Sequence, residues 1–187
     1  MLILASASPR RRELLELTGR TYQCISPETE EGVPEGTEAQ DVPELLAVKK
    51  AEAVLETHPQ DIVIGADTIV ELDGQILGKP SSPEEAVWML RQLSGNTHMV
   101  YTGVAILSAA RREHFTTVTK VEFYSLTEEE IQAYVATGEP MDKAGAYGIQ
   151  GKGALLVKRI HGDFYTVMGL PIGEVERHLR RFDQEIG

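Results

Sequence analysis

Cysteine is almost absent from the sequence, and so are long apolar segments. The 187 residues include a single cysteine, Cys24, which excludes an internal disulfide and lacks a nearby partner for a zinc site. We expect it to be a small strand residue. No apolar run approaches the roughly 20 residues that span a bilayer, and the apolar start meets Ser8 and Arg10 too soon for a signal peptide. We therefore expect a protein of the cytosol that has no membrane partner.

Positive charge is also scarce. The chain has 18 Lys and Arg against 29 Asp and Glu, which gives a net charge of -11. A nucleic acid backbone requires a basic footprint, so we expect no nucleic-acid partner. A small anionic molecule needs only a local basic pocket, and Arg10, Arg11 and Arg12 offer one.

The composition and the hydrophobic pattern favour an α/β protein. With 42% hydrophobic and 25% charged residues, the chain can bury one core, and we expect a single domain over residues 1–187. Strands and helices mix without strict alternation, which predicts a mixed, twisted sheet flanked by helices. The predicted strands cover residues 2–5, 21–26, 61–77 with a break near Gly65 to Asp67, 97–109, 114–126 and a hairpin around Gly162.

Helix starts can be read from capping residues. We predict helices from Pro9 to Gly19, after a capping box of Asp41 and Glu44, after Ser82 and Pro83, after a box of Thr127 and Glu130, and from Pro171. A tight hairpin turn is predicted at Asp73-Gly74.

Hydroxyl and guanidinium groups gather at the start of the first predicted helix. Ser8 is the expected N-cap, and Arg10, Arg11 and Arg12 follow Pro9 in the first turn. Free backbone N–H groups together with guanidinium groups are suited to a polyphosphate. The alternative is a capped surface helix with solvated arginines. Against it, positive charges in a first turn oppose the helix dipole and each other, which favours an anionic ligand.

Asp67 is the candidate acidic residue. It follows apolar strand residues and lies beside Gly65, where we expect the chain to turn and expose the carboxylate at a strand end. Such a carboxylate can hold Mg2+ or position a water for attack on phosphorus. The alternative is a turn aspartate that bonds to its own backbone.

Three lysines are candidate phosphate ligands. Lys79 follows the predicted hairpin beside Pro80, although a lone loop lysine is usually solvated. Lys49 and Lys50 lie on a predicted helix with an apolar stripe, so one should face solvent while the other points toward the arginine turn. The sequence does not rank these two.

Residues 138–153 form a glycine-rich segment that we expect to lack regular structure. Its glycines permit a ligand to approach the backbone, Tyr147 offers a ring for stacking, and Gln150 offers an amide that donates and accepts. The segment matches neither the dinucleotide fingerprint nor the Walker phosphate loop, and a tight structural loop is the alternative.

Taken together, these segments resemble the Maf family of nucleotide pyrophosphatases. The resemblance covers nearly the whole chain in the family's order. It is carried by LILASASPRRRELL, KKAEAV, VIGADTIV, ILGKP, LSGNTHMVYTGVA, YVATGEPMDKAGAYGIQG and VMGLPI. It implies an elongated α/β fold, related to that of the inosine triphosphate pyrophosphatases, with a cleft between two lobes. It also implies an enzyme that uses Mg2+ or Mn2+ and forms a homodimer.

The resemblance assigns a role to each candidate residue. It makes Asp67 the catalytic carboxylate and proton acceptor. The residues implied to surround the phosphates of the nucleoside triphosphate are Ser8, Arg11, Lys50 and Lys79. Those implied to govern substrate choice are Arg10, Thr68 and Gln150.

The glycine-rich segment also resembles the dTTP and UTP branch of the family rather than the 7-methyl-GTP branch. The reaction implied is hydrolysis to the monophosphate and pyrophosphate, and the resemblance also implies a place in removing modified nucleotides and a link to cell division arrest. The family has an acidic residue after its second strand that assists the metal. We assign the metal to Asp67 and Glu31, with Glu28 and Glu30 as alternatives.

Two other functions fit the same residues. A nucleotide-binding regulator of septum formation needs the basic residues and the glycine-rich segment but not a water-activating carboxylate. A purine-directed triphosphate pyrophosphatase would share the chemistry and differ in its base pocket. Measuring pyrophosphate release from a panel of nucleotides separates all three.

Overall fold

The structure, a computed structural model, describes residues 1–29 and 32–183. The chain divides into two compact units. Unit 1 comprises Met1–Asp67, Thr102–Thr117 and Gly169–Gly187, and unit 2 comprises Thr68–Tyr101 and Val118–Met168. Both units are therefore built from segments that are far apart in sequence.

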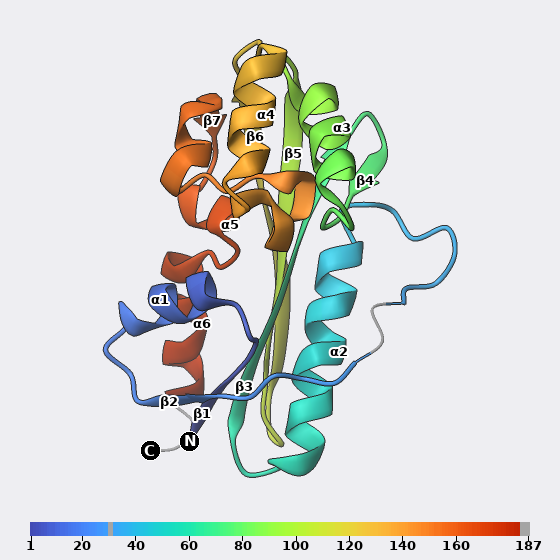
Figure 1. The fold of residues 1–187 in the computed structure, drawn as a ribbon. Coiled ribbons are helices and arrows are strands. Elements are labelled where there is room, and N and C mark those ends of the chain that lie inside the picture. The colour runs from blue at the N-terminus through green and yellow to red at the C-terminus, as the bar shows by residue number, and fades with distance from the viewer. Residues whose placement is uncertain (30–31, 184–187) are drawn as a thin grey trace. The chain divides into compact units, whose positions relative to one another are not determined.

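The strands of the described residues form one seven-stranded mixed sheet (Figure 1). They are β1 (Leu2–Ala5), β2 (Tyr22–Cys24), β3 (Ile62–Leu72), β4 (Gln75–Leu77), β5 (Thr97–Leu107), β6 (Arg112–Phe123) and β7 (Val157–His161). Their order is β2-β1-β3-β5-β6-β7, and β4 pairs with β3. β1 is parallel to both β2 and β3, whereas β3 with β4 and β6 with β7 are antiparallel. The predicted mixed α/β class is confirmed.

All five predicted helices are present, three of them with the expected side-chain caps, and one further short helix was not predicted. They are α1 (Pro9–Glu16), α2 (Val42–Thr57), α3 (Pro83–Leu93), α4 (Glu128–Ala136), α5 (Phe164–Met168) and α6 (Ile172–Asp183). Ser8 and Ser82 each cap a helix with a side-chain oxygen, and Thr127 forms a complete capping box with Glu130. Within the described part of the chain, no helix combines the length and apolar character needed to cross a membrane.

Unit 1 has a core of small and branched apolar side chains. Ile3 and Ala5 of β1 pack with Ala47 and Ala51 of α2. Gly65 of β3 permits this close approach, since a Cβ there would lie 2.2 Å from the carbonyl oxygen of Ala47. Figure 1 shows α2 lying along β3. The small residues thus fix the distance between the helix that carries Lys50 and the strand that carries Asp67.

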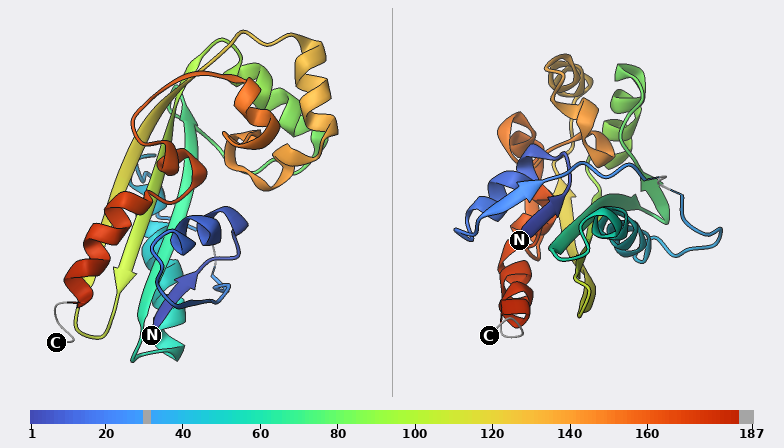
Figure 2. Two further views of the ribbon diagram at one scale, coloured as in Figure 1. Left: turned by 90° about the vertical axis from the view of Figure 1, so that its left-hand side faces the viewer. Right: turned by 90° about the horizontal axis from the view of Figure 1, so that it is seen from below.

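Unit 2 has a larger apolar core with one buried polar pair. α3 and α4 pack against each other, as Figure 2 shows. Phe123 and Tyr147 make edge-on ring contacts with each other and with His98, which is only 1% exposed. The Tyr147 hydroxyl lies 2.6 Å from Nε2 of His98. Leu90 and Ile131 complete this side of the core.

The predicted break at Gly65 to Asp67 is wrong. β3 runs without interruption through Ile62–Leu72, and Asp67 lies within the strand rather than at its end. The glycine serves the packing of α2 and not a turn. The turn that follows at Asp73-Gly74 is confirmed, and both residues have positive φ, 50° and 83°.

Two further local predictions are wrong. Asp41 precedes α2 with a helical rather than extended backbone and makes no side-chain capping bond, and the Glu44 carboxylate accepts bonds from His114 and Thr116 instead of closing the box. The chain around Gly162 is not a hairpin, since β7 pairs with β6 and is followed by α5. The glycine-rich segment contains only short 3-10 helices, η1 (Glu139–Asp142), η2 (Ala144–Ala146) and η3 (Gly151–Leu155).

Candidate functional site

The start of α1 presents a hydroxyl and a row of arginines. Ser8 has an extended backbone, and its Oγ accepts a hydrogen bond of 3.4 Å from the backbone N–H of Arg11. Pro9 opens the helix, and the first turn has no acidic residue. Arg10 and Arg11 are partly exposed, whereas Arg12 is exposed. The arrangement is that of an anion site, because N–H groups, the helix dipole and guanidinium charge coincide.

The Arg11 side chain is oriented by the protein. Its Nε donates a 2.7 Å hydrogen bond to the carbonyl oxygen of Gly169, which precedes α6. Burial lowers the pKa of Arg11, Asp67 raises it, and the neighbouring Arg10 lowers it. Arginine nevertheless remains protonated in proteins. A fixed cation therefore lies close enough to Asp67 for the two charges to interact.

Asp67 forms an ion pair with Lys50. The Lys50 Nζ is 2.5 Å from Oδ1 of Asp67, and the two side chains are 14% and 13% exposed. The adjacent Lys49 instead donates to the carbonyl oxygen of Gly32 at an exposed position. The structure thus assigns Lys50 to the acidic residue and Lys49 to the surface, which the sequence left open.

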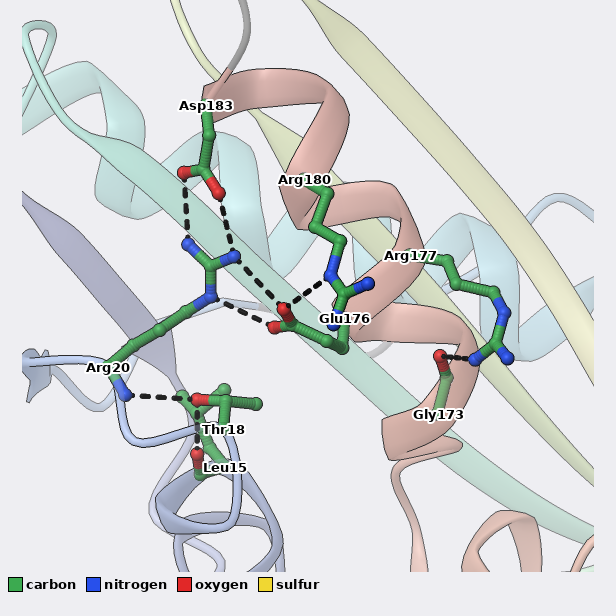
Figure 3. Close-up of polar contacts among 8 residues, drawn as sticks. All are labelled: Leu15, Thr18, Arg20, Gly173, Glu176, Arg177, Arg180 and Asp183. Carbon is green, nitrogen blue, oxygen red and sulfur yellow. Dashed lines mark hydrogen bonds and ion pairs between the residues drawn. The ribbon is translucent and has the colours of Figure 1, made fainter.

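A charged network joins the end of α1 to α6 (Figure 3). Arg20 donates through Nε to Glu176 at 2.9 Å and through Nη2 to Asp183 at 2.8 Å. Arg180 donates to the same Glu176 at 3.0 Å. The Thr18 hydroxyl accepts from the backbone N–H of Arg20 at 3.3 Å. Together with the bond from Arg11 to Gly169, these contacts connect both the start of α1 and the residues just after it to the segment that contains α6.

Unit 2 carries the remaining predicted residues. Thr68 is partly exposed and follows Asp67 in β3. Lys79 is exposed just after β4, and Gln150 is a partly exposed residue that precedes η3. The structure brings Arg11, Lys50 and Asp67 together in unit 1. The roles of Thr68, Lys79 and Gln150 remain predictions.

The predicted metal ligands are only partly covered by the structure. Glu30 and Glu31 lie outside the described residues, and Glu28 is exposed. Among residues 1–29 and 32–183, no three His, Cys, Asp or Glu side chains form a group that could hold a metal ion. Mg2+ commonly binds through one or two carboxylates together with waters and substrate phosphates. The Asp67 carboxylate is a donor that fits this mode.

The predicted stacking role of Tyr147 is wrong. The residue is 5% exposed, its ring packs in the core of unit 2 and its hydroxyl pairs with His98. Burial raises its pKa. A ring enclosed in this way presents no face to a nucleobase.

Two contributions were not predicted from the sequence. The carbonyl oxygen of Gly169 orients Arg11, and backbone atoms carry no sequence signal for such a contact. Glu139 bonds to the chain on the far side of Gln150, at Lys152 and Gly153. An acidic residue inside a glycine-rich segment was the available signal for the second contribution.

Comparisons with known proteins identify a family and similar relatives. Residues 1–182 match the family described as Maf-like protein. The chain is 52% identical over 185 residues to the dTTP/UTP pyrophosphatase of Bacillus mycoides (strain KBAB4), covering 99% of this chain and 97% of that protein. It is 54% identical over 181 residues to the dTTP/UTP pyrophosphatase of Bacillus cytotoxicus, covering 97% and 95%.

A solved structure has a similar fold. It is a HAM1 protein from Coxiella burnetii, which aligns with a TM-score of 0.53 at 17% sequence identity. The alignment covers 96% of this chain and 98% of the other. At this identity the likeness concerns the fold alone.

Proposed function

Because the chain belongs to the Maf family, we propose that it is a nucleoside triphosphate pyrophosphatase that hydrolyses dTTP and UTP to the monophosphate and pyrophosphate. The observation that carries the chemistry is the group formed by Asp67, Lys50 and Arg11. One carboxylate and two cations, beside a helix N-terminus, suit an anionic substrate attacked by water.

In the proposed reaction, water attacks the α-phosphorus and pyrophosphate leaves. Asp67 orients the water and accepts its proton, while Lys50 and Arg11 hold the phosphate oxygens. Ser8 and the N–H groups of the first turn of α1 provide further donors. Phosphoryl transfer is catalysed mainly by positioning and by stabilising charge, which is the chemistry these groups provide.

We propose that Asp67 holds a divalent cation, Mg2+ or Mn2+, together with substrate oxygens. Hard cations select carboxylate, phosphate and water ligands. When bound, such an ion offsets negative charge on the phosphates. Glu31 remains the proposed second ligand.

The unit 2 residues are proposed to contact the same substrate. Lys79 is assigned to the leaving pyrophosphate, and Thr68 and Gln150, with Arg10 of unit 1, to substrate choice. The pairing edge of thymine or uracil reads acceptor, donor, acceptor, and a carboxamide can meet a neighbouring donor and acceptor. Cytosine reverses two of these groups, so dCTP should be a poorer substrate than dTTP.

We also propose that residues 1–187 act as one functional domain, that two copies form a homodimer, and that the enzyme works in the cytoplasm. These proposals rest on the family. Light scattering of the purified protein measures the homodimer directly, and a monomeric mass at micromolar concentration would contradict it.

The decisive experiment measures pyrophosphate release from the common triphosphates. We expect Asp67→Asn to lower kcat/KM for dTTP and UTP by about 10²- to 10⁴-fold, the usual contribution of a positioned general base, with the fold retained. Near-normal turnover by the folded variant would remove Asp67 from the chemistry. A wild type that binds triphosphates without releasing pyrophosphate would favour a nucleotide-binding regulator of septum formation. A preference for purines would favour a purine-directed triphosphate pyrophosphatase.

The neighbouring lysines supply a matched control for that experiment. Lys50→Ala removes the cation paired with Asp67 and should also reduce kcat/KM strongly, whereas Lys49→Ala removes an equal charge from the exposed face of the same helix. Equal losses in the two variants would indicate a general effect of helix charge and not a contact with Asp67.

A further inference from the structure

The segment that carries Gln150 is held by the side chain of one acidic residue. Glu139 begins η1 and is partly buried. Its Oε1 accepts from the backbone N–H of Gly153 at 3.1 Å, and its Oε2 accepts from that of Lys152 at 3.2 Å. One carboxylate thus fixes two successive peptide groups on the C-terminal side of Gln150.

The N-terminal side of Gln150 is fixed through a tyrosine. The Tyr134 hydroxyl donates to Oε1 of Glu139 at 2.9 Å and accepts from the backbone N–H of Gly148 at 3.1 Å. Tyr134 belongs to α4 and is only 5% exposed, so its position is set by the core of unit 2. The backbone is therefore anchored both before and after Gln150, directly by Glu139 after it and by a hydroxyl bonded to Glu139 before it.

The glycines of this segment are required by the same arrangement. Gly151 has φ of 65°, and a Cβ there would lie 2.9 Å from Oε2 of Glu139. A Cβ on Gly153 would lie 1.8 Å from the carbonyl oxygen of Gly148. The two ends of the segment thus touch each other, with the carboxylate beside them and no room for further side chains.

The protonation state of Glu139 agrees with this role. Burial alone would raise its pKa, but hydrogen bonds from Tyr134, Gly153 and Lys152 oppose burial, and the net pKa is lowered. An ionised carboxylate accepts hydrogen bonds at both oxygens and donates none. The three donors that face it are therefore all satisfied at neutral pH.

We propose that Glu139 is a positioning residue for base recognition, which sets the place of Gln150 by holding the backbone directly at Lys152 and Gly153 and, through the Tyr134 hydroxyl, at Gly148. The inference rests on the proposed function, because Gln150 reads a pyrimidine only if the enzyme hydrolyses pyrimidine triphosphates. Glu139 itself does not touch the nucleotide. Its effect falls on discrimination between bases, since small displacements of a recognition group cost affinity steeply.

The test compares Glu139→Gln with a matched control. The amide has nearly the same size, but its NH2 group faces a backbone donor, so one anchor is lost. Glu129→Gln removes the same charge from an exposed position on α4. We expect Glu139→Gln to lower the ratio of kcat/KM for dTTP to that for dCTP about tenfold or more, and Glu129→Gln to leave the ratio unchanged.

A double variant separates positioning from general loosening of the fold. If Glu139 acts through Gln150, then Glu139→Gln combined with Gln150→Ala should discriminate no worse than Gln150→Ala alone. Additive losses of discrimination would overturn the proposal. If Glu139→Gln does not fold, Tyr134→Phe removes only the hydroxyl that links Gly148 to Glu139, and it should shift the ratio in the same direction.

Nuclear magnetic resonance gives a readout independent of activity. The backbone amide signals of Lys152 and Gly153 should move in Glu139→Gln and not in Glu129→Gln. Shifted amides with an unchanged dTTP to dCTP ratio would overturn the positioning role while the pyrophosphatase stands. A wild type that hydrolyses no pyrimidine triphosphate would instead overturn the proposed function.

Discussion

The two units differ in how far charged pairs, beside apolar packing, join their separate chain segments. In unit 1, carboxylates paired with an arginine or a histidine link the three segments to one another. These links are Arg20–Glu176, Glu44–His114 and Glu113–His178. In unit 2, the two segments meet mainly in a large apolar cluster, beside which His98 pairs with Tyr147, and an exposed ion pair joins Arg91 to Glu128.

The difference determines which conditions disturb each unit. Charged links at a surface weaken with salt and with loss of a partner's charge, whereas apolar burial changes little with either. In unit 1, Glu113 illustrates the first case: burial alone would raise its pKa, but hydrogen bonds from His178 and Arg111 lower it. In unit 2, burial lowers the pKa of His98 without any contribution from an acidic neighbour.

Substitution of glycines at close backbone contacts, which both units contain, should cause the largest losses of stability. Gly65→Ala places a Cβ 2.2 Å from the carbonyl oxygen of Ala47 in unit 1, and Gly153→Ala places one 1.8 Å from that of Gly148 in unit 2. The backbone cannot move at either position without disturbing its packing, so each substitution should lower the free energy of unfolding by about 3 kcal/mol or more. Urea denaturation measures both.

Two other glycines provide the control for this prediction. Gly32 and Gly78 have ordinary φ, and a Cβ added at either would meet nothing within 4 Å, so alanine at either should change stability little. Comparable destabilisation by all four substitutions would mean that the tight contacts have no special part in either unit.

His98 should make unit 2 sensitive to mild acid. The described residues of unit 1 include no buried histidine of this kind. Burial lowers the pKa of His98 from 6.5 to about 4. The unfolded chain then binds the proton more readily, so stability is complete above pH 6.5 and is lost as the pH falls toward 4. The full loss is about 3 kcal/mol, at 1.36 kcal/mol for each pKa unit.

The measurement is the free energy of unfolding between pH 6.5 and 5, above the range in which most carboxylates titrate. His98→Gln retains a group able to bond the Tyr147 hydroxyl but does not titrate, and it should flatten this part of the profile. An identical slope in wild type and variant would assign the acid sensitivity to other groups.

Arg20 should give the smallest effect and the strongest dependence on salt. The Arg20 side chain is 23% exposed, and its guanidinium bonds Asp183 and Glu176, which both raise its pKa. Exposed pairs contribute little, so Arg20→Ala should cost about 1 kcal/mol at low salt and less at high salt. Arg177→Ala is the control, because Arg177 bonds only to the Gly173 carbonyl of its own helix among the contacts in Figure 3. A loss independent of salt would point to packing by the Arg20 stem.

Local signals predicted much of the fold, and contacts between distant segments explain where the predictions are wrong. Ser82 and Thr127 mark real helix starts because a cap needs only its own helix. Glu44 does not close its predicted box because His114 and Thr116, which are distant in sequence, attract its carboxylate. Gly65 indicated a break, yet it serves the approach of α2 to an uninterrupted strand.

The site was predictable in its residue types more than in its geometry. The sequence placed an acid at Asp67 and a lysine at 49 or 50, and only packing of the helix on the strand selects Lys50. Tyr147 was assigned to a ligand because aromatic rings in glycine-rich segments suit stacking, but the core of unit 2 encloses it. The hydrogen bonds from backbone N–H groups to Glu139 could not be predicted, because no periodic sequence pattern marks such contacts.

The bond between Arg20 and Asp183 joins residues 163 positions apart, and this has a consequence for synthesis on the ribosome. A chain emerges from its N-terminus at about 5 to 20 residues per second, so α1 exists well before its partner helix. Unit 2 has all its residues once Met168 is out, whereas unit 1 must wait for α6. During synthesis, unit 2 can therefore fold first, whereas unit 1, which carries Asp67, completes its fold last.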